Sequence, residues 1–156
     1  MKINWKKLLI CLAIPLAVGG LGALLSGGMS DYGAMEKPPL SPPGWVFPVV
    51  WSILYLVMGY ASYRILESDA TKGEKQKALI LYGLQLVFNF VWPLLFFGGG
   101  WFLLSFFWLI ALWVLILLTI RAFSGIDETA GNLLLPYILW VTFAAYLNFG
   151  IYLLNG

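Results

Sequence analysis

Long apolar stretches dominate the chain, and the charged side chains fall between them. Four runs contain no charged residue: 8–30, 38–63, 78–120 and 129–156. A helix that crosses the roughly 30 Å hydrocarbon core of a bilayer needs about 20 mainly apolar residues, so three of these runs fit one crossing each. The run 78–120 fits two crossings, with Gly98, Gly99 and Gly100 where a tight connection would fall. The pattern predicts five membrane-spanning helices.

We therefore expect an all-α membrane protein, a five-transmembrane-helix bundle that forms a single membrane domain over residues 1–156. The expected spans lie at about 7–27, 45–66, 78–97, 101–121 and 132–154, with an outer loop at 28–44.

The first apolar run, which follows Lys2, Lys6 and Lys7, also has the outline of a secretory signal peptide. However, its 8–30 stretch exceeds the 7–15 apolar residues usual in such peptides. We expect a retained first helix.

Polar and aromatic residues recur at helical spacing inside three of the spans, which places each set on one helix face. The sets are Phe47, Trp51, Tyr55, Met58 and Ser62; then Gln85, Asn89, Trp92 and Phe96; and last Tyr137, Trp140, Ala144 and Asn148. Amides that face lipid are unfavourable, so Gln85, Asn89 and Asn148 should face the bundle interior. These faces either enclose a cleft for a flat, largely apolar ligand or simply pack against one another.

The basic residues lie mostly on one side of the predicted bundle. Eight of the nine Lys and Arg residues share the side of the N-terminus, and only Lys37 lies on the other. The positive-inside rule then puts the N-terminus in the cytoplasm and the C-terminus outside.

Composition excludes several classes of function. Hydrophobic residues make up 62% of the chain and charged residues 10%, far from the values of soluble domains. There is no histidine, and Cys11 is the single cysteine, so we expect no metal site and no disulfide within the chain. The net charge of +2 is too small for a nucleic-acid partner. No charged residue lies firmly within a span, which argues against an ion-coupled pump.

The outer loop 28–44 is stiffened by Pro38, Pro39, Pro42 and Pro43. It is either an ordinary connector or a lid that brings Tyr32 to the membrane surface. A ridge of small residues on the first helix, Gly19, Ala23 and Gly27, suits close helix packing, within the monomer or in a dimer.

Several motifs resemble the translocator protein family, which is also called the tryptophan-rich sensory protein or peripheral benzodiazepine receptor family. They are Lys37-Pro38-Pro39, Pro42-Pro43, Trp51, Leu54-Tyr55 and Met58-Gly59, then Gln85-Leu86, Asn89, Trp92 and Phe96-Phe97, and finally Leu135-Pro136-Tyr137, Trp140, Ala144 and Leu147-Asn148. The resemblance covers nearly the whole chain and fits a bacterial-type member.

The resemblance implies a five-helix bundle in a lipid bilayer, often a homodimer, with a cavity that opens toward the first loop. It implies porphyrins such as protoporphyrin IX as ligands, together with synthetic isoquinoline carboxamides and benzodiazepines, and no required cofactor. With the helix faces above, the expected ligand-binding residues are Tyr32, Pro42, Phe47, Trp51, Tyr55, Asn89, Trp92, Tyr137, Trp140, Ala144 and Asn148. Two departures are Asp31, where relatives often have tryptophan, and the lack of Lys or Arg after Tyr152, which leaves nothing to suggest sterol binding.

Three hypotheses follow from these residues. In the first, the protein is a membrane receptor or carrier whose tetrapyrrole stacks on Trp51 and Trp140, while amides or Lys37 meet its carboxylates. In the second, it degrades bound porphyrin in light, with Trp51 and Trp140 as the candidate catalytic residues. In the third, it is an interaction or scaffold protein that acts through the small-residue ridge.

Overall fold

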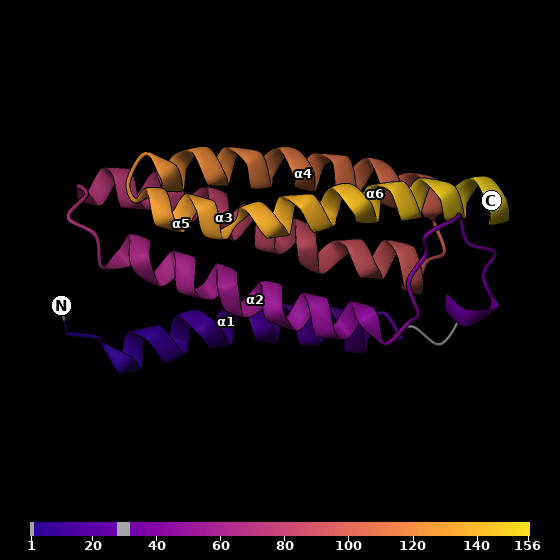
Figure 1. Ribbon diagram of the computed structural model, residues 1–156, viewed down its shortest axis with the longest axis horizontal. Helices are drawn as coiled ribbons and strands as arrows, with labels where there is room; N and C mark the ends of the chain where they lie inside the picture. Colours follow the sequence, from indigo (N-terminus) through magenta and orange to yellow (C-terminus); the bar gives the residue numbers. More distant parts are fainter. Residues whose placement is uncertain (1, 28–31) are drawn as a thin grey trace.

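The computed structural model describes residues 2–27 and 32–156, and in this part of the chain it is a bundle of long helices (Figure 1). The elements are α1 (Trp5–Leu25), the 3₁₀ turn η1 (Tyr32–Ala34), α2 (Val46–Leu66), α3 (Lys72–Pro93), the π-helical turn η2 (Leu94–Gly98), α4 (Phe102–Ser124), α5 (Glu128–Leu133) and α6 (Leu135–Asn155). Among the described residues, five stretches are long and apolar enough to cross a membrane, which confirms the predicted architecture.

Helix α3 begins earlier than predicted, at Lys72 instead of 78. Thr71 caps it, because the Glu74 backbone N–H donates to its hydroxyl at 3.2 Å. A charged first turn can extend a helix beyond the hydrocarbon region, so the charge-free run marked the membrane span and not the helix start. At the other end, α3 stops at Pro93 and passes into the π-helical turn before the predicted glycine connection.

The last span is also divided differently from the prediction. Asp127 caps the short helix α5, whose residues Glu128–Leu133 precede the break at Leu134. Helix α6 then begins at Leu135 with Pro136 in its first turn, a position where proline needs no backbone partner. The predicted span 132–154 thus corresponds to α6 and overlaps only the last two residues of α5, because the charge-free run 129–156 does not show the break at Leu134.

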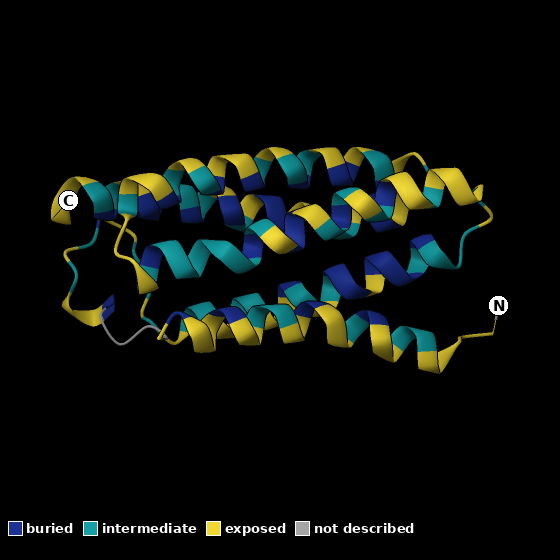
Figure 2. Ribbon diagram, turned by 180° about the vertical axis from the view of Figure 1, so that it is seen from behind, coloured by how far each residue is buried: buried dark blue, intermediate teal, exposed yellow. Residues whose placement is uncertain are grey.

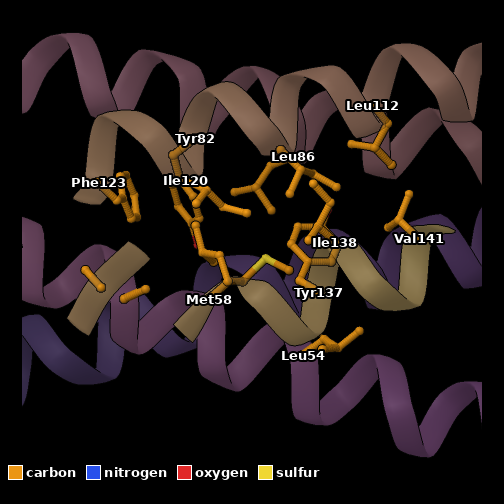
Figure 3. Packing of buried hydrophobic residues seen from close by; sticks show 14 of the residues in the cluster. Leu54, Met58, Tyr82, Leu86, Leu112, Ile120, Phe123, Tyr137, Ile138 and Val141 are labelled. Atoms are coloured by element: carbon orange, nitrogen blue, oxygen red, sulfur yellow. The ribbon is translucent and has the colours of Figure 1, made fainter. Parts of the chain in front are cut away.

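The core lies between α2, α3, α4 and α6, where Met58, Ile116 and Phe123 have no exposed surface. Figure 3 shows the packed side chains, with Met58 and Tyr137 at its centre. The outer helix faces are exposed (Figure 2), and they carry apolar side chains such as Leu118 and Leu139. Large contiguous apolar surfaces are rare on soluble monomers and mark contact with a membrane or a partner, so the exterior suits a bilayer.

The two ends of the bundle differ in charge. The N-terminal end of α1, the α2–α3 connection and the α4–α5 connection lie together at one end (Figure 1). Two ion pairs tie these segments, Lys7 with Glu67 and Arg64 with Asp127, each at 2.7 Å. The opposite end carries the loop that precedes α2 and the C-terminus of α6.

Candidate functional site

A cavity of about 510 Å³ lies in the half of the bundle that is nearer the loop before α2. Its wall is built from α1, α2, α3, η2, α4 and α6, and Tyr32 of η1 also lines it. Ligand cavities usually hold about 300–1,000 Å³ and combine apolar walls with a few placed polar groups. The space is therefore large enough for a sizeable flat molecule.

Eight of the eleven predicted ligand-binding residues line this cavity: Tyr32, Phe47, Trp51, Tyr55, Asn89, Trp92, Ala144 and Asn148. Seven of them come from the three predicted faces, on α2, α3 and α6, and Tyr32 comes from η1. The amides of Gln85, Asn89 and Asn148 are all buried, as expected.

The other three predicted residues, Pro42, Tyr137 and Trp140, do not line the cavity. Pro42 accepts a hydrogen bond from the Tyr32 hydroxyl at 2.7 Å through its carbonyl oxygen. Tyr137 lies deeper, with only 2% of its surface exposed. Trp140 packs edge-on against Phe47, with the ring centres 5.8 Å apart, so it supports a wall residue from behind. A tetrapyrrole in the cavity would thus meet Trp51 but not Trp140.

The polar part of the wall is formed by Tyr55 and Asn89. The Tyr55 hydroxyl donates to Asn89 Oδ1 at 2.8 Å. Asn89 Nδ2 donates at 2.8 Å to the hydroxyl of Tyr137, which in turn donates to Gln85 Oε1 at 2.6 Å. These bonds fix the orientation of Tyr55 and Asn89 from the side away from the cavity.

A second amide, Asn148, holds Trp92 in the wall. Trp92 Nε1 donates to Asn148 Oδ1 at 3.0 Å, and Asn148 Nδ2 donates to the Phe102 carbonyl at 2.8 Å. The Trp92 ring stacks on Phe96 of η2, with centres 5.0 Å apart. Since the polar atoms of Asn148 are already bonded, its role in this arrangement is to position the aromatic wall.

Trp51 offers the flat surface nearest the polar group. Its ring stacks on Tyr55, with the centres 5.6 Å apart and the planes 27° from parallel. Its edge meets Tyr137 at 6.2 Å. A flat ligand beside Trp51 would therefore contact an indole and a tyrosine hydroxyl together.

The loop before α2 covers one end of the cavity and is fastened to α6. The Asn155 amide bonds both the backbone N–H and the carbonyl of Glu36, at 3.1 and 2.7 Å. The Tyr146 hydroxyl donates to the Pro39 carbonyl at 2.6 Å. Tyr32 is 5% exposed and contacts Phe47, and burial raises the pKa of its hydroxyl. This arrangement favours the lid over the plain connector.

Lys37 does not reach the cavity, contrary to the expectation that it meets a ligand carboxylate. Its ammonium group donates to the carbonyls of Tyr32 and Met35, each at 3.0 Å, and lies 4.8 Å from the centre of the Tyr32 ring. It therefore stabilises the turn that carries Tyr32. Asp31, the other departure in this loop, lies outside the described residues.

The sequence patterns did not predict that α1 forms part of the cavity wall. Gly19, Gly20 and Ala23 line the cavity, and the Tyr55 ring fills the space where a side chain on Gly19 would lie. Two members of the predicted ridge of small residues thus face the interior of this chain. Their spacing alone predicts close packing and does not distinguish a cavity wall from a helix interface.

No group of three His, Cys, Asp or Glu side chains within residues 2–27 and 32–156 is arranged to hold a metal ion. The chemistry of this site lies in its indole, phenol and amide groups.

Comparison with known proteins agrees with the motifs. The family model described as the TspO/MBR family matches residues 11–154, which include the whole cavity wall. The chain belongs to the TspO/MBR family. This TspO/MBR protein is 38% identical over 150 residues to a tryptophan-rich protein TspO from Chlorobaculum tepidum, which covers 95% of each chain.

Other relatives of this TspO/MBR protein come from bacteria and animals. It is 35% identical over 155 residues to a tryptophan-rich sensory protein from Cereibacter sphaeroides, covering 99% of this chain and 95% of the relative. It is 37% identical over 142 residues to a translocator protein from Ovis aries, covering 87% of this chain and 82% of the relative. Together with its five apolar helices, this membership makes it an integral membrane protein.

Proposed function

We propose that this protein is a membrane receptor or carrier that binds a flat, largely apolar molecule in its cavity, with protoporphyrin IX as one ligand. The observation that carries the proposal is the joint placement of Trp51, Tyr55 and Asn89 on one wall of a cavity of about 510 Å³. Aromatic surface gives a planar ring its contact area, and the hydroxyl and amide give it orientation. Isoquinoline carboxamides and benzodiazepines combine the same features.

Titration with protoporphyrin IX tests this proposal, with the protein in lipid nanodiscs and tryptophan fluorescence as the signal. Binding should quench the fluorescence, and Trp51→Phe should weaken affinity about fivefold, since loss of a stacked aromatic contact is worth about 1 kcal/mol. Trp113→Phe is the matched control, because Trp113 does not line the cavity and its Nε1 donates to Thr142 at 2.9 Å. Equal affinity of wild type, Trp51→Phe and Trp113→Phe would refute the proposed site.

Metal-free porphyrin should bind at least as well as haem. The chain has no histidine, which is a common axial ligand of haem iron. Parallel absorbance titrations with protoporphyrin IX and haem compare the two affinities directly. Clearly tighter binding of haem would show that another side chain ligates the iron.

The stack of Trp51 on Tyr55 favours a second candidate, light-dependent degradation of the bound porphyrin. An indole next to the ligand can donate an electron to the excited porphyrin, which leaves an indole radical cation and a porphyrin radical anion that can react further. Loss of porphyrin absorbance should then require both light and protein, and Trp51→Phe should slow it. Trp140→Phe should have a smaller effect, because Trp140 lies behind Phe47. Unchanged spectra under illumination would count against this activity.

The proposal includes the orientation in the membrane. We place the charged end, with Lys7 and Arg64, at the cytoplasmic face of a bacterial cell membrane, and the cavity end with the lid at the outer face. Single cysteines introduced at Ser68 and Gly99, in a Cys11→Ser background, should react with impermeant reagents from opposite sides of sealed vesicles. Labelling of both positions from one side would contradict the alternating connections.

The proposed assembly is a homodimer in the lipid bilayer, as the family resemblance implies. Mass measurement of the protein in detergent by light scattering should give twice the 17.4 kDa mass of one chain. A monomer that binds protoporphyrin IX with unchanged affinity would separate ligand binding from assembly.

A further inference from the structure

A row of polar side chains leads from the cavity wall into the packed core. It begins at Tyr55 and continues through Asn89, Tyr137 and Gln85. The last three residues are 4%, 2% and 1% exposed, and neither Tyr137 nor Gln85 lines the cavity. Figure 3 shows Tyr137 within this core, beside Met58 and Leu54.

Each hydrogen bond in this row points away from the cavity. Tyr55 donates to Asn89, Asn89 donates to Tyr137, and Tyr137 donates to Gln85. The proton of the Tyr55 hydroxyl is therefore used, and its oxygen can only accept a hydrogen bond from a ligand. At the far end, Gln85 Nε2 is buried and has no partner among the described residues.

The same four side chains can form the row in the opposite direction. The oxygen and nitrogen of an amide have nearly the same shape, so Asn89 and Gln85 can each turn by 180° in the same space. Gln85 Nε2 would then donate to Tyr137, Tyr137 to Asn89 Oδ1, and Asn89 Nδ2 to Tyr55. Both directions contain three hydrogen bonds and leave one Gln85 atom without a partner. In the reversed row, Tyr55 is free to donate its proton into the cavity.

We infer that Gln85 is a specificity-determining residue that acts at a distance. Through Tyr137 and Asn89, its amide decides whether Tyr55 accepts a hydrogen bond from the ligand or donates one to it. An intact row lets one cavity accept ligands of either kind. This inference rests on the proposed function, because it concerns the polarity of the same cavity.

Three flat tricyclic probes of nearly equal size separate the two directions. Carbazole carries an N–H donor, acridine a ring-nitrogen acceptor, and anthracene neither. In Gln85→Leu, the Tyr137 hydroxyl loses its acceptor and turns its proton toward Asn89, which favours the reversed row. Affinity for acridine relative to carbazole should rise roughly three- to tenfold, the contribution of one hydrogen bond, while anthracene affinity stays unchanged.

Two comparisons make the result specific to the row. In a Tyr137→Phe background the connection is broken, so Gln85→Leu should no longer change the acridine-to-carbazole ratio. Tyr82→Phe is the matched control: Tyr82 lies one turn before Gln85 on α3, and its buried hydroxyl has no partner in the described part of the chain. This variant should leave the ratio unchanged.

The affinities can be measured by partition of each probe between protein-loaded and empty nanodiscs. An unchanged ratio in Gln85→Leu with normal anthracene binding overturns the inference and leaves the proposed function standing. The inference is also overturned if Gln85→Leu changes the acridine-to-carbazole ratio equally in the wild-type and Tyr137→Phe backgrounds. If wild type binds none of the three probes but still binds protoporphyrin IX, the inference is overturned and the proposed function stands; if it binds neither the probes nor protoporphyrin IX, both are overturned. If Gln85→Leu does not fold, Gln85→Met supplies the same apolar change with the shape of glutamine, and the same result is expected.

Discussion

The ring of Tyr55 lies directly over Gly19, in space that any side chain at position 19 would occupy. This contact connects α1 with the polar wall of the cavity. It also explains why a glycine is needed on a helix that otherwise gains stability from larger residues, since glycine weakens a helix interior by about 1 kcal/mol.

Gly19→Ala should therefore displace Tyr55 and weaken ligand binding, with an expected loss in affinity of about tenfold from overpacking. Gly20→Ala is a close control: Gly20 also lines the cavity, but no heavy atom outside its own helix lies within 4 Å of the added carbon. Protoporphyrin IX titration of both variants measures the difference. Equal affinities would show that Tyr55 moves aside without consequence.

Gly59 brings α2 close to α1. A Cβ at this position would lie 2.9 Å from Leu12 Cα and against the Cys11 carbonyl, which is the group that Pro15 leaves without its usual helical donor. Gly59→Ala should lower the free energy of unfolding by about 1–3 kcal/mol, because backbone atoms cannot move aside as a side chain can. Denaturant unfolding in mixed micelles measures this loss.

Gly83→Ala, on α3, serves as the control for Gly59→Ala because a methyl group there meets no heavy atom within 4 Å outside its own helix. It should raise stability slightly through helix propensity. A loss of stability at Gly83 equal to that at Gly59 would contradict the packing argument.

The ion pair between Arg64 and Asp127 should make stability depend on pH. Burial raises the pKa of the Asp127 carboxyl, but the hydrogen bond and charge of Arg64 outweigh it and hold the pKa below its usual value of 3.8. A lowered folded-state pKa means that this stabilisation is present above pH 3.8 and is lost as the pH falls through the folded-state value. The unfolding temperature should therefore fall in acid, by an amount that corresponds to about 1 kcal/mol or less for a partly exposed pair.

Asp127→Asn should flatten this part of the pH profile, since asparagine can still cap α5 but does not ionise. Glu128→Gln is the neighbouring control, as Glu128 forms no ion pair with the residues that the structure describes. If both variants give the same profile as wild type, the acid sensitivity arises from other carboxylates.

The hydrogen bonds that hold the lid, the loop before α2, against α6 should control the rate at which a ligand dissociates. Tyr146→Phe removes the hydrogen bond to the Pro39 carbonyl, and Asn155→Ala removes both bonds to Glu36. Tyr146→Phe should speed ligand dissociation by roughly three- to tenfold, the equivalent of about one net hydrogen bond, and Asn155→Ala by at least as much because it removes two. Stopped-flow displacement of bound protoporphyrin IX gives the rate.

Tyr152→Phe is the lid control, because the Tyr152 hydroxyl has no hydrogen bond to any described residue. Its dissociation rate should match wild type. A rate unaffected by Tyr146→Phe and Asn155→Ala would mean that the ligand leaves by a route other than the lid.

The number of membrane-spanning helices and their inward faces could be predicted from the sequence because both follow from local properties. A membrane span needs a charge-free apolar run of fixed length, and a buried amide needs a partner, so Asn89 and Asn148 had to face inward. The helix period then placed Trp92 on the face of Asn89 and Ala144 on the face of Asn148, and it put Trp51 and Tyr55 together on one face of the second span. Helix ends were less certain, as Lys72 and Leu134 show, because capping residues and not hydropathy decide them.

Which of the inward residues meet the cavity was decided by tertiary structure. Tyr137 and Trp140 share a helix with Ala144, yet only Ala144 lines the cavity. The spacing of Gly19 is that of a helix-packing residue. In the structure Gly19 lines the cavity, because the side chain of Tyr55 on α2 reaches α1 and lies against it. Periodicity determines the face on which a side chain lies, while its depth depends on the distance to the facing helix. The distance between two helices is set by contacts between residues that are far apart in the chain, so it cannot be predicted from a local sequence pattern.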